Sequence, residues 1–252
     1  MPQGGVLSHG TPVGERKEQM RHIVSAACGL WLCLPLPVAA QSTNGVLVEL
    51  FTSQGCSSCP PADEFLSELS QADGVIALAL HVDYWDYIGW EDQFADPAYT
   101  ERQKMYARAV GSRMIYNPQM IVGGLDRVEG NTPDAVVRFI GKHMAHPTGV
   151  ALTLTRNGAQ VEIQARTDRP LPNGAFVQLV RYRPEAVVDI DRGENAGRSM
   201  TYHNIVTSWQ QLGEWPGAAP LDLTADAPGD EPVVVILQEP GPARVRAAAR
   251  LN

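Results

Sequence analysis

The hydrophobic positions between residues 46 and 146 follow two alternating patterns. Val46–Phe51 is a short apolar strand, and Val75–Val82 is a continuous apolar run, typical of a strand that is covered on both faces. From Cys56 to Ser70 the apolar residues recur every three or four positions, which predicts a helix with one buried face. This alternation of strands and helices is typical of an α/β layer structure.

The remainder of this half continues the same pattern. A helix is expected over residues 96–110, with Asp96 as its cap. A strand is expected over 119–122 and a weaker return strand over 127–129. The last helix of this half is expected over 132–143.

After residue 149 the pattern changes to strands alone. Runs at 150–155 and 160–167 flank Asn157-Gly158, a favoured two-residue hairpin turn. Residues 218–232 are rich in Pro, Ala and Asp, and we expect them to form a surface loop. The other expected strands cover 175–183, 200–209, 233–238 and 244–248. This half therefore predicts an antiparallel β sandwich or layer.

The first forty residues predict an export signal. The uncharged stretch from 23 to 40 follows Met20-Arg21-His22 and ends in small residues, as secretory signals do. Pro35 and Pro37 leave a helix-forming part that is too short to span a bilayer, which disfavours a retained anchor. We expect removal of residues 1–40, with Met20 as a candidate initiator. The mature protein is then periplasmic or secreted, without a stable membrane span.

Composition and charge exclude several classes of function. The 252 residues are 44% hydrophobic and 19% charged, an ordinary globular composition. With a net charge of −8 and no basic run, the chain is unsuited to binding nucleic acid or anionic lipid through phosphate contacts. Cys28 and Cys33 fall in the expected signal. The mature chain then keeps only Cys56 and Cys59, in an oxidising compartment.

The segment Cys56-Ser57-Ser58-Cys59 carries the clearest chemistry. It follows an apolar strand and opens the expected helix, where unpaired N–H groups and the helix dipole favour a Cys56 thiolate. Cys59 lies close enough in sequence to resolve a mixed disulfide, and we expect it to be the more buried and less reactive thiol. One alternative is a passive disulfide, although so short a loop removes little unfolded-state entropy. The other is half of a metal site, although the sequence holds no second pair of this kind.

Residues 81–87 end the second apolar run with polar and aromatic side chains. Ligand sites in open α/β sheets lie at such strand ends. His81 or Asp83 is therefore a candidate to relay a proton to Cys59, and Tyr84 and Trp85 are candidates to line a peptide groove. An aromatic cover over the sheet end explains the same residues, and the sequence leaves both explanations open.

The chain resembles two known groups of proteins. Residues 46–146 resemble a thioredoxin-like domain in their order of strand, CxxC helix, strand, helix, proline, hairpin and helix. Over about residues 46–250 the sequence resembles the secreted proteins of the DUF1223 family. The segments that carry this second resemblance are Val48–Asp63, His81–Trp90, Tyr116–Met120 and Arg192–Asn195. The expected fold is an α/β thioredoxin-like domain over 41–148 followed by an all-β antiparallel, sandwich-like domain over 149–252.

The thioredoxin-like resemblance gives Asn117-Pro118 a role. It implies a cis Asn117–Pro118 bond beside the two cysteines, with the Asn117 backbone free to bind an extended substrate chain. The polar segment Arg192–Asn195 either turns onto its own backbone or folds over the cysteines, and the sequence does not separate these possibilities.

These observations predict an exported thiol–disulfide oxidoreductase that acts on protein or peptide partners. Cys56 attacks and Cys59 resolves the mixed disulfide, so that neither a cofactor nor a bound metal is required. The alternative is an envelope binding or redox-sensing protein that holds Cu(I) through Cys56, Cys59 and His81.

Overall fold

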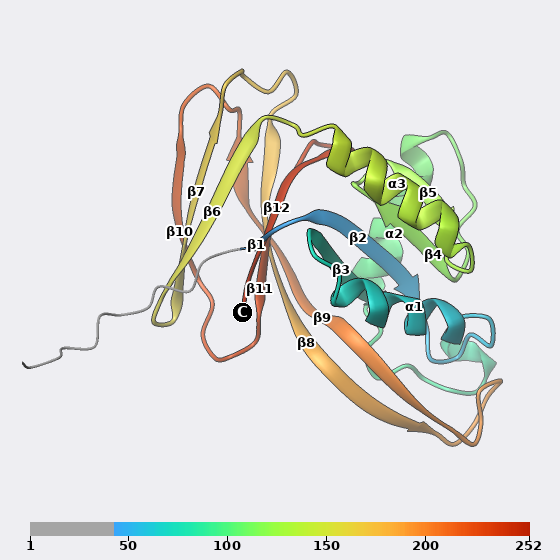
Figure 1. Ribbon diagram of the computed structural model, residues 1–252. Helices are drawn as coiled ribbons and strands as arrows, with labels where there is room; N and C mark the ends of the chain where they lie inside the picture. Colours follow the sequence, from blue (N-terminus) through green and yellow to red (C-terminus); the bar gives the residue numbers. More distant parts are fainter. Residues whose placement is uncertain (1–42) are drawn as a thin grey trace, which may run out of the picture. The chain divides into compact units, whose positions relative to one another are not determined.

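The computed structural model describes residues 43–252, which form twelve strands, three α-helices and one short 3-10 helix (Figure 1). The export signal expected over residues 1–40 lies outside the described residues. The elements of the first half are β1 (Thr43–Asn44), β2 (Val46–Thr52), α1 (Pro60–Ser70), β3 (Val75–His81), η1 (Asp86–Ile88), α2 (Pro97–Ala109), β4 (Gln119–Val122), β5 (Asp126–Glu129) and α3 (Pro133–Ala145). Those of the second half are β6 (Val150–Asn157), β7 (Gln160–Thr167), β8 (Ala175–Ile190), β9 (Arg198–Trp215), β10 (Leu221–Asp226), β11 (Val233–Gln238) and β12 (Val245–Leu251).

Nine of these strands form one mixed sheet. Its strand order is β1-β12-β11-β8-β9-β3-β2-β4-β5. β3 is parallel to both of its neighbours, β2 and β9, and the other pairs in the sheet are antiparallel. A second, antiparallel sheet has the order β10-β7-β6. None of the helices among the described residues is long and apolar enough to cross a membrane.

The expectation of a thioredoxin-like domain followed by a separate β sandwich is wrong. Strands from both halves of the chain share the nine-stranded sheet, and the two halves meet where β9 lies beside β3. Ala79 is opposite Ile205 at this junction, and the Asn204 side-chain amide donates to the Ala77 carbonyl at 2.8 Å. Local patterning predicts a strand but not its partner, because pairing depends on contacts distant in sequence. The boundary expected at residues 148–149 falls in the connection between α3 and β6.

The central strands β2 and β3 are covered on both faces, as the apolar run of β3 predicts. Helices α1 and α3 lie on one face of the sheet and α2 on the other (Figure 1). Val48 and Leu50 of β2 belong to the core shared with α1 and α3, whereas Leu47 and Phe51 belong to the core shared with α2. This division follows from the alternation of side chains along a strand. All four residues are fully buried. The predicted Asp96 cap is confirmed, because its carboxylate accepts from the Ala98 N–H at 2.8 Å.

The second sheet packs against β8, β11 and β12 of the large sheet. Leu152 and Ile163 share this core with Val177 and Val235. The prediction of a surface loop over 218–232 is wrong in part, because β10 pairs with β7 along its whole length. Its alternating Leu, Leu and Ala positions face the core, a pattern concealed by the surrounding Pro and Asp residues.

Candidate functional site

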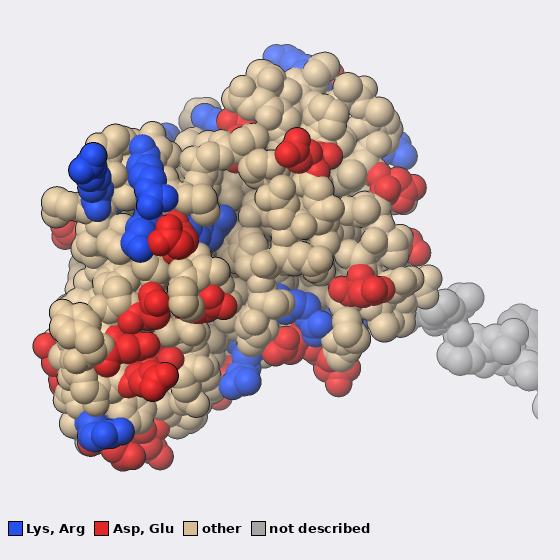
Figure 2. Space-filling model, turned by 180° about the vertical axis from the view of Figure 1, so that it is seen from behind, with Lys and Arg blue, Asp and Glu red and all other residues tan. Residues whose placement is uncertain are grey.

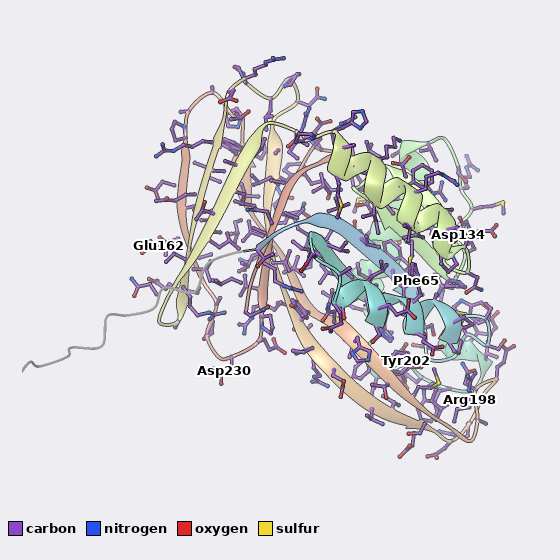
Figure 3. The ribbon with its side chains drawn as sticks, in the orientation of Figure 1. Phe65, Asp134, Glu162, Arg198, Tyr202 and Asp230 are labelled. Atoms are coloured by element: carbon purple, nitrogen blue, oxygen red, sulfur yellow. A yellow bond between two sulfur atoms is a disulfide. The ribbon has the colours of Figure 1, made fainter. Side chains whose placement is uncertain are left out.

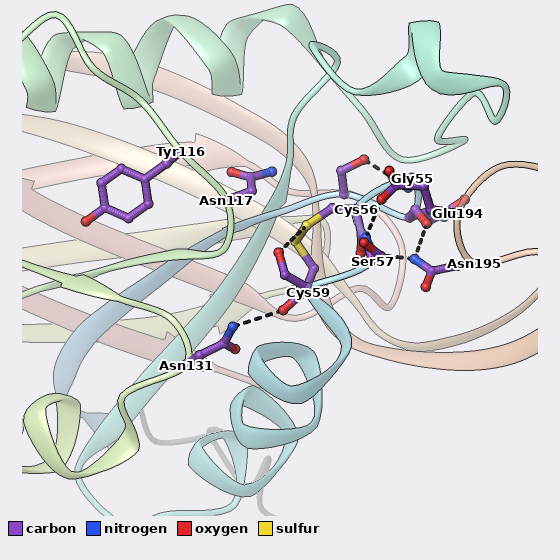
Figure 4. The surroundings of a disulfide bond; sticks show 12 residues. Gly55, Cys56, Ser57, Cys59, Tyr116, Asn117, Asn131, Glu194 and Asn195 are labelled. Carbon is purple, nitrogen blue, oxygen red and sulfur yellow. Dashed lines mark hydrogen bonds between the residues drawn. A yellow bond between two sulfur atoms is a disulfide. The ribbon is translucent and has the colours of Figure 1, made fainter.

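Cys56 and Cys59 are joined by a disulfide at the start of α1, with their Cα atoms 5.4 Å apart (Figure 4). The expected helix start at Cys56 is wrong, because α1 begins at Pro60 and Cys59 is its N-cap. Pro60 and Pro61 have no N–H to donate to the carbonyls four residues earlier, so the helix cannot extend back to Cys56. Cys56–Cys59 is instead a turn, in which the Cys59 N–H donates to the Cys56 carbonyl at 3.2 Å.

Both cysteines are completely buried. The expected difference in burial between Cys56 and Cys59 is therefore absent in the disulfide state. Ser57 and Ser58 between them are exposed, so the turn itself lies at the surface. The relative reactivity of the two thiols stays a prediction.

Part of the surroundings of the cysteine turn comes from the hairpin of β8 and β9. The Asn195 side-chain amide donates to the carbonyls of Gln54 and Cys56, at 2.9 and 3.0 Å. The Glu194 carboxylate accepts from the Ser57 N–H at 3.3 Å (Figure 4). The segment Arg192–Asn195 thus folds against the cysteines, which the sequence had left undecided.

The loops on either side of β4 and β5 also approach the turn. The Asn117–Pro118 peptide bond is cis, as predicted. Pro118 packs beside the start of α1, since a Cβ added at Gly130 would lie 2.7 Å from the Pro118 Cβ and 3.1 Å from the Ala62 Cβ. The Asn131 side-chain amide donates to the Ser58 carbonyl at 3.1 Å, and Asn117 lies in the same surroundings (Figure 4).

Tyr84 and Trp85 contact different segments near the disulfide. The Tyr84 hydroxyl is 2.7 Å from Asn117 Oδ1 and 3.0 Å from Gln103 Oε1, and burial raises the Tyr84 pKa. Trp85 lies against the cysteine turn, because a Cβ added at Gly55 would be 3.6 Å from the Trp85 Cβ. The structure thus brings both aromatic residues to the segments that border the disulfide.

A buried histidine–carboxylate pair supports the turn from within. His81 is fully buried, and its Nδ1 is 2.7 Å from Asp92 Oδ2. The same carboxylate oxygen accepts from the Gln54 N–H at 2.8 Å, which links the pair directly to the cysteine turn. Tyr202 of β9, labelled in Figure 3, packs edge-on against the His81 imidazole, with 5.1 Å between the ring centroids. Burial alone would lower the pKa of His81, but the Asp92 and Asp63 carboxylates raise it.

Asp63 is the second buried carboxyl of this region. It lies one helical turn after Cys59, and its N–H donates to the Cys59 carbonyl at 3.1 Å. Burial raises the pKa of Asp63 to about 7, although His81 opposes the shift. Among the described residues, Asp63 Oδ2 and His81 Nε2 are both buried without a hydrogen-bond partner. Asp83 is not part of this cluster, because it accepts from the Thr100 hydroxyl of α2.

Sequence reasoning missed several of these residues. The four-residue spacing from Cys59 could have pointed to Asp63, because such positions share one face of a helix. No local signal pointed to Asp92 or Asn131, since both reach the turn from loops distant in sequence.

Comparison with known proteins identifies the family. The family model described as "Protein of unknown function (DUF1223)" matches residues 47–238. The chain belongs to the DUF1223 family. The X-ray crystal structure of protein AGR_C_4864 from Agrobacterium tumefaciens is similar, with 35% sequence identity and a TM-score of 0.71. The alignment covers 82% of this chain and 93% of that chain. No curated protein matches the sequence significantly.

Within residues 43–252 of this DUF1223 protein, no three His, Cys, Asp or Glu side chains are grouped so that they could hold a metal ion. The alternative of a Cu(I) site at Cys56, Cys59 and His81 therefore finds no support in the arrangement of these side chains.

Proposed function

We propose that this DUF1223 protein is an exported thiol–disulfide oxidoreductase that acts on protein or peptide partners in the periplasm or outside the cell. The observation that carries the proposal is the number of separate segments that hydrogen-bond the Cys56–Cys59 turn. Asn131, Glu194 and Asn195 hydrogen-bond it within 3.3 Å, and Asp92 holds Gln54, two residues before it. A bridge that closes so short a loop contributes little as a staple, so this support favours a chemical role.

The proposed reaction is a two-step exchange. In the reduced protein the Cys56 thiolate attacks one sulfur of a substrate disulfide, which forms a mixed disulfide and releases the first substrate thiolate. The Cys59 thiolate then attacks Cys56 Sγ, releases the second substrate thiolate and closes the Cys56–Cys59 bond. Two electrons pass from the protein dithiol to the substrate disulfide, and the reverse sequence oxidises a substrate dithiol. No cofactor is required.

Asp63 is the side chain that we assign to accept the Cys59 proton. It lies one helical turn from Cys59, and its pKa of about 7 suits an acceptor at neutral pH. His81, oriented by Asp92, opposes the rise in the Asp63 pKa. We assign this proton transfer to Asp63 rather than to Asp83, because the Asp83 carboxylate accepts from the Thr100 hydroxyl of α2.

The substrate contacts follow from the loops that border the disulfide. Trp85 lies against Gly55, and the Tyr84 hydroxyl donates a hydrogen bond to Asn117 Oδ1. We assign Tyr84, Trp85, Asn117 and Pro118 to the binding of an extended peptide segment, with the Asn117 backbone as its hydrogen-bonding partner.

Single-cysteine variants test the proposal. In Cys59→Ser, Cys56 should form a stable mixed disulfide with glutathione disulfide and should titrate below the free thiol value of about 8.5. Cys56→Ser should form little mixed disulfide under the same conditions. Mass spectrometry and alkylation rates from pH 5 to pH 10 measure both properties. Equal rates and unshifted titrations for the two thiols would favour a passive disulfide instead.

A further inference from the structure

The β8–β9 hairpin reaches from the second half of the chain to the cysteine turn. Its strands are 16 and 18 residues long, and Figure 1 shows them extending past the second sheet toward the start of α1. Near the tip, Ile190 and Tyr202 pack with Trp90 and Phe94, which belong to the loop after β3. The tip is therefore held by packing against the loop after β3 as well as by hydrogen bonds to the segment of the cysteine turn.

Asn195 anchors the tip. Its side chain is 2% exposed, and its amide nitrogen donates to the Gln54 and Cys56 carbonyls. Its amide oxygen accepts from the Arg198 guanidinium at 3.0 Å. Every polar atom of this side chain is thus engaged, and the adjacent residue Glu194 is placed over the turn.

Glu194 brings a negative charge to the residue that follows Cys56. Its exposed carboxylate accepts from the Ser57 N–H at 3.3 Å. Other charged groups lie near the turn: Asp63 of α1, the His81–Asp92 pair that holds Gln54, and Arg198 of β9, which donates to Asn195. Of these acidic groups Glu194 is exposed, whereas Asp63 and Asp92 are buried.

The loop after β3 adds further negative charge at the same end of the molecule. Burial raises the pKa of Asp86, and the nearby Asp92, Asp83 and Glu91 carboxylates raise it further. Figure 2 shows acidic side chains gathered at the lower left of the space-filling view, the end that holds this loop and the hairpin tip. A cationic group beside a substrate disulfide would be attracted electrostatically to these carboxylates.

We propose that Glu194 is a specificity-determining residue that favours substrates with positive charge beside the reacting disulfide, and that Asn195 is the positioning residue that holds it there. This inference rests on the proposed exchange reaction. It names a substrate class, cationic peptide segments, that the cysteine pair alone does not indicate.

Two small disulfides of opposite charge test the inference. In the Cys59→Ser background, the rate of mixed-disulfide formation at Cys56 is measured with cystamine, a dication, and with 3,3′-dithiodipropionate, a dianion, at pH 7 and low salt. The ratio of the two rates cancels any change in the Cys56 thiolate fraction, because both reagents meet the same thiolate. We expect cystamine to react faster, and Glu194→Gln to reduce the ratio about threefold to tenfold. Added salt should reduce it too, as screening predicts.

Two further variants make the result specific. Asn195→Ala should reduce the ratio of the cystamine rate to the dithiodipropionate rate, as Glu194→Gln does. A general loss of structure would change both rates alike and leave their ratio unchanged. Glu214→Gln removes an exposed charge at the opposite end of the same hairpin and should leave the ratio unchanged. If Cys56 still reacts but Glu194→Gln leaves the ratio of the two rates unchanged, this inference is wrong and the proposed function stands. If Cys56 reacts with neither reagent in any variant, the proposed function fails as well.

Discussion

Replacing Glu49 by alanine should destabilise the protein by about 3–5 kcal/mol, because it leaves a buried guanidinium without its counter-charge. Glu49 is fully buried in β2, and Arg102 Nε of α2 donates to its carboxylate at 2.6 Å. The Tyr106 hydroxyl donates to the other carboxylate oxygen. Arg102 also donates to Gln238 of β11 at 3.0 Å and stacks over Trp209 of β9 at 3.9 Å. The network thus ties α2 to three strands of the large sheet.

Urea unfolding of the oxidised protein measures this effect. Glu68→Ala, which removes an exposed carboxylate from α1, is the matched control and should change stability by less than about 0.5 kcal/mol. The double variant Glu49→Leu with Arg102→Met should cost less than Glu49→Ala, since it leaves no buried charge unpaired. A loss below about 1 kcal/mol for Glu49→Ala would show that water reaches Arg102 and compensates for the missing carboxylate.

Raising the pH from 5 to 8 should lower the free energy of unfolding by about 2–3 kcal/mol, because the buried carboxyl of Asp63 must ionise. The pKa of Asp63 is about 7 in the folded state because of burial, against an ordinary value of 3.8. Between these values the folded state binds more protons than the unfolded state, so stability falls as the pH rises. His81, whose folded pKa is also raised, contributes in the same direction, and Asp92 and Tyr202 complete the ionisable surroundings of this site.

The Asp63→Asn variant separates this contribution. It should lose less stability between pH 5 and pH 8 than the unmodified protein, and it should be the more stable of the two at pH 8. It should also slow the attack of Cys59 on a mixed disulfide at Cys56, because the proton acceptor is absent. Asp73→Asn, an exposed control in the turn after α1, should leave both properties unchanged. An identical pH dependence in Asp63→Asn would mean that Asp63 is already ionised at pH 5.

Local patterning along the chain identified most of the elements and the pair of cysteines that forms the disulfide. β4 and β11 have the predicted bounds, and α2 begins at the predicted Asp96 cap. Such features depend on residues a few positions apart, so spacing, capping and turn chemistry suffice to predict them. The choice of Cys56 and Cys59 as candidate residues, and the cis bond before Pro118, also followed from motifs and from resemblance.

The tertiary structure alone decided how these pieces are joined. The pairing of β9 with β3 places both halves in one sheet and overturns the two-domain expectation. It also brings Asn195 to carbonyls 139 and 141 residues earlier in the chain. The ionisation of Asp63 depends on burial among His81, Asp92 and Tyr202, from a strand, a loop and the hairpin. Strand partners and electrostatic surroundings depend on distant contacts, which neither periodicity nor motif spacing records.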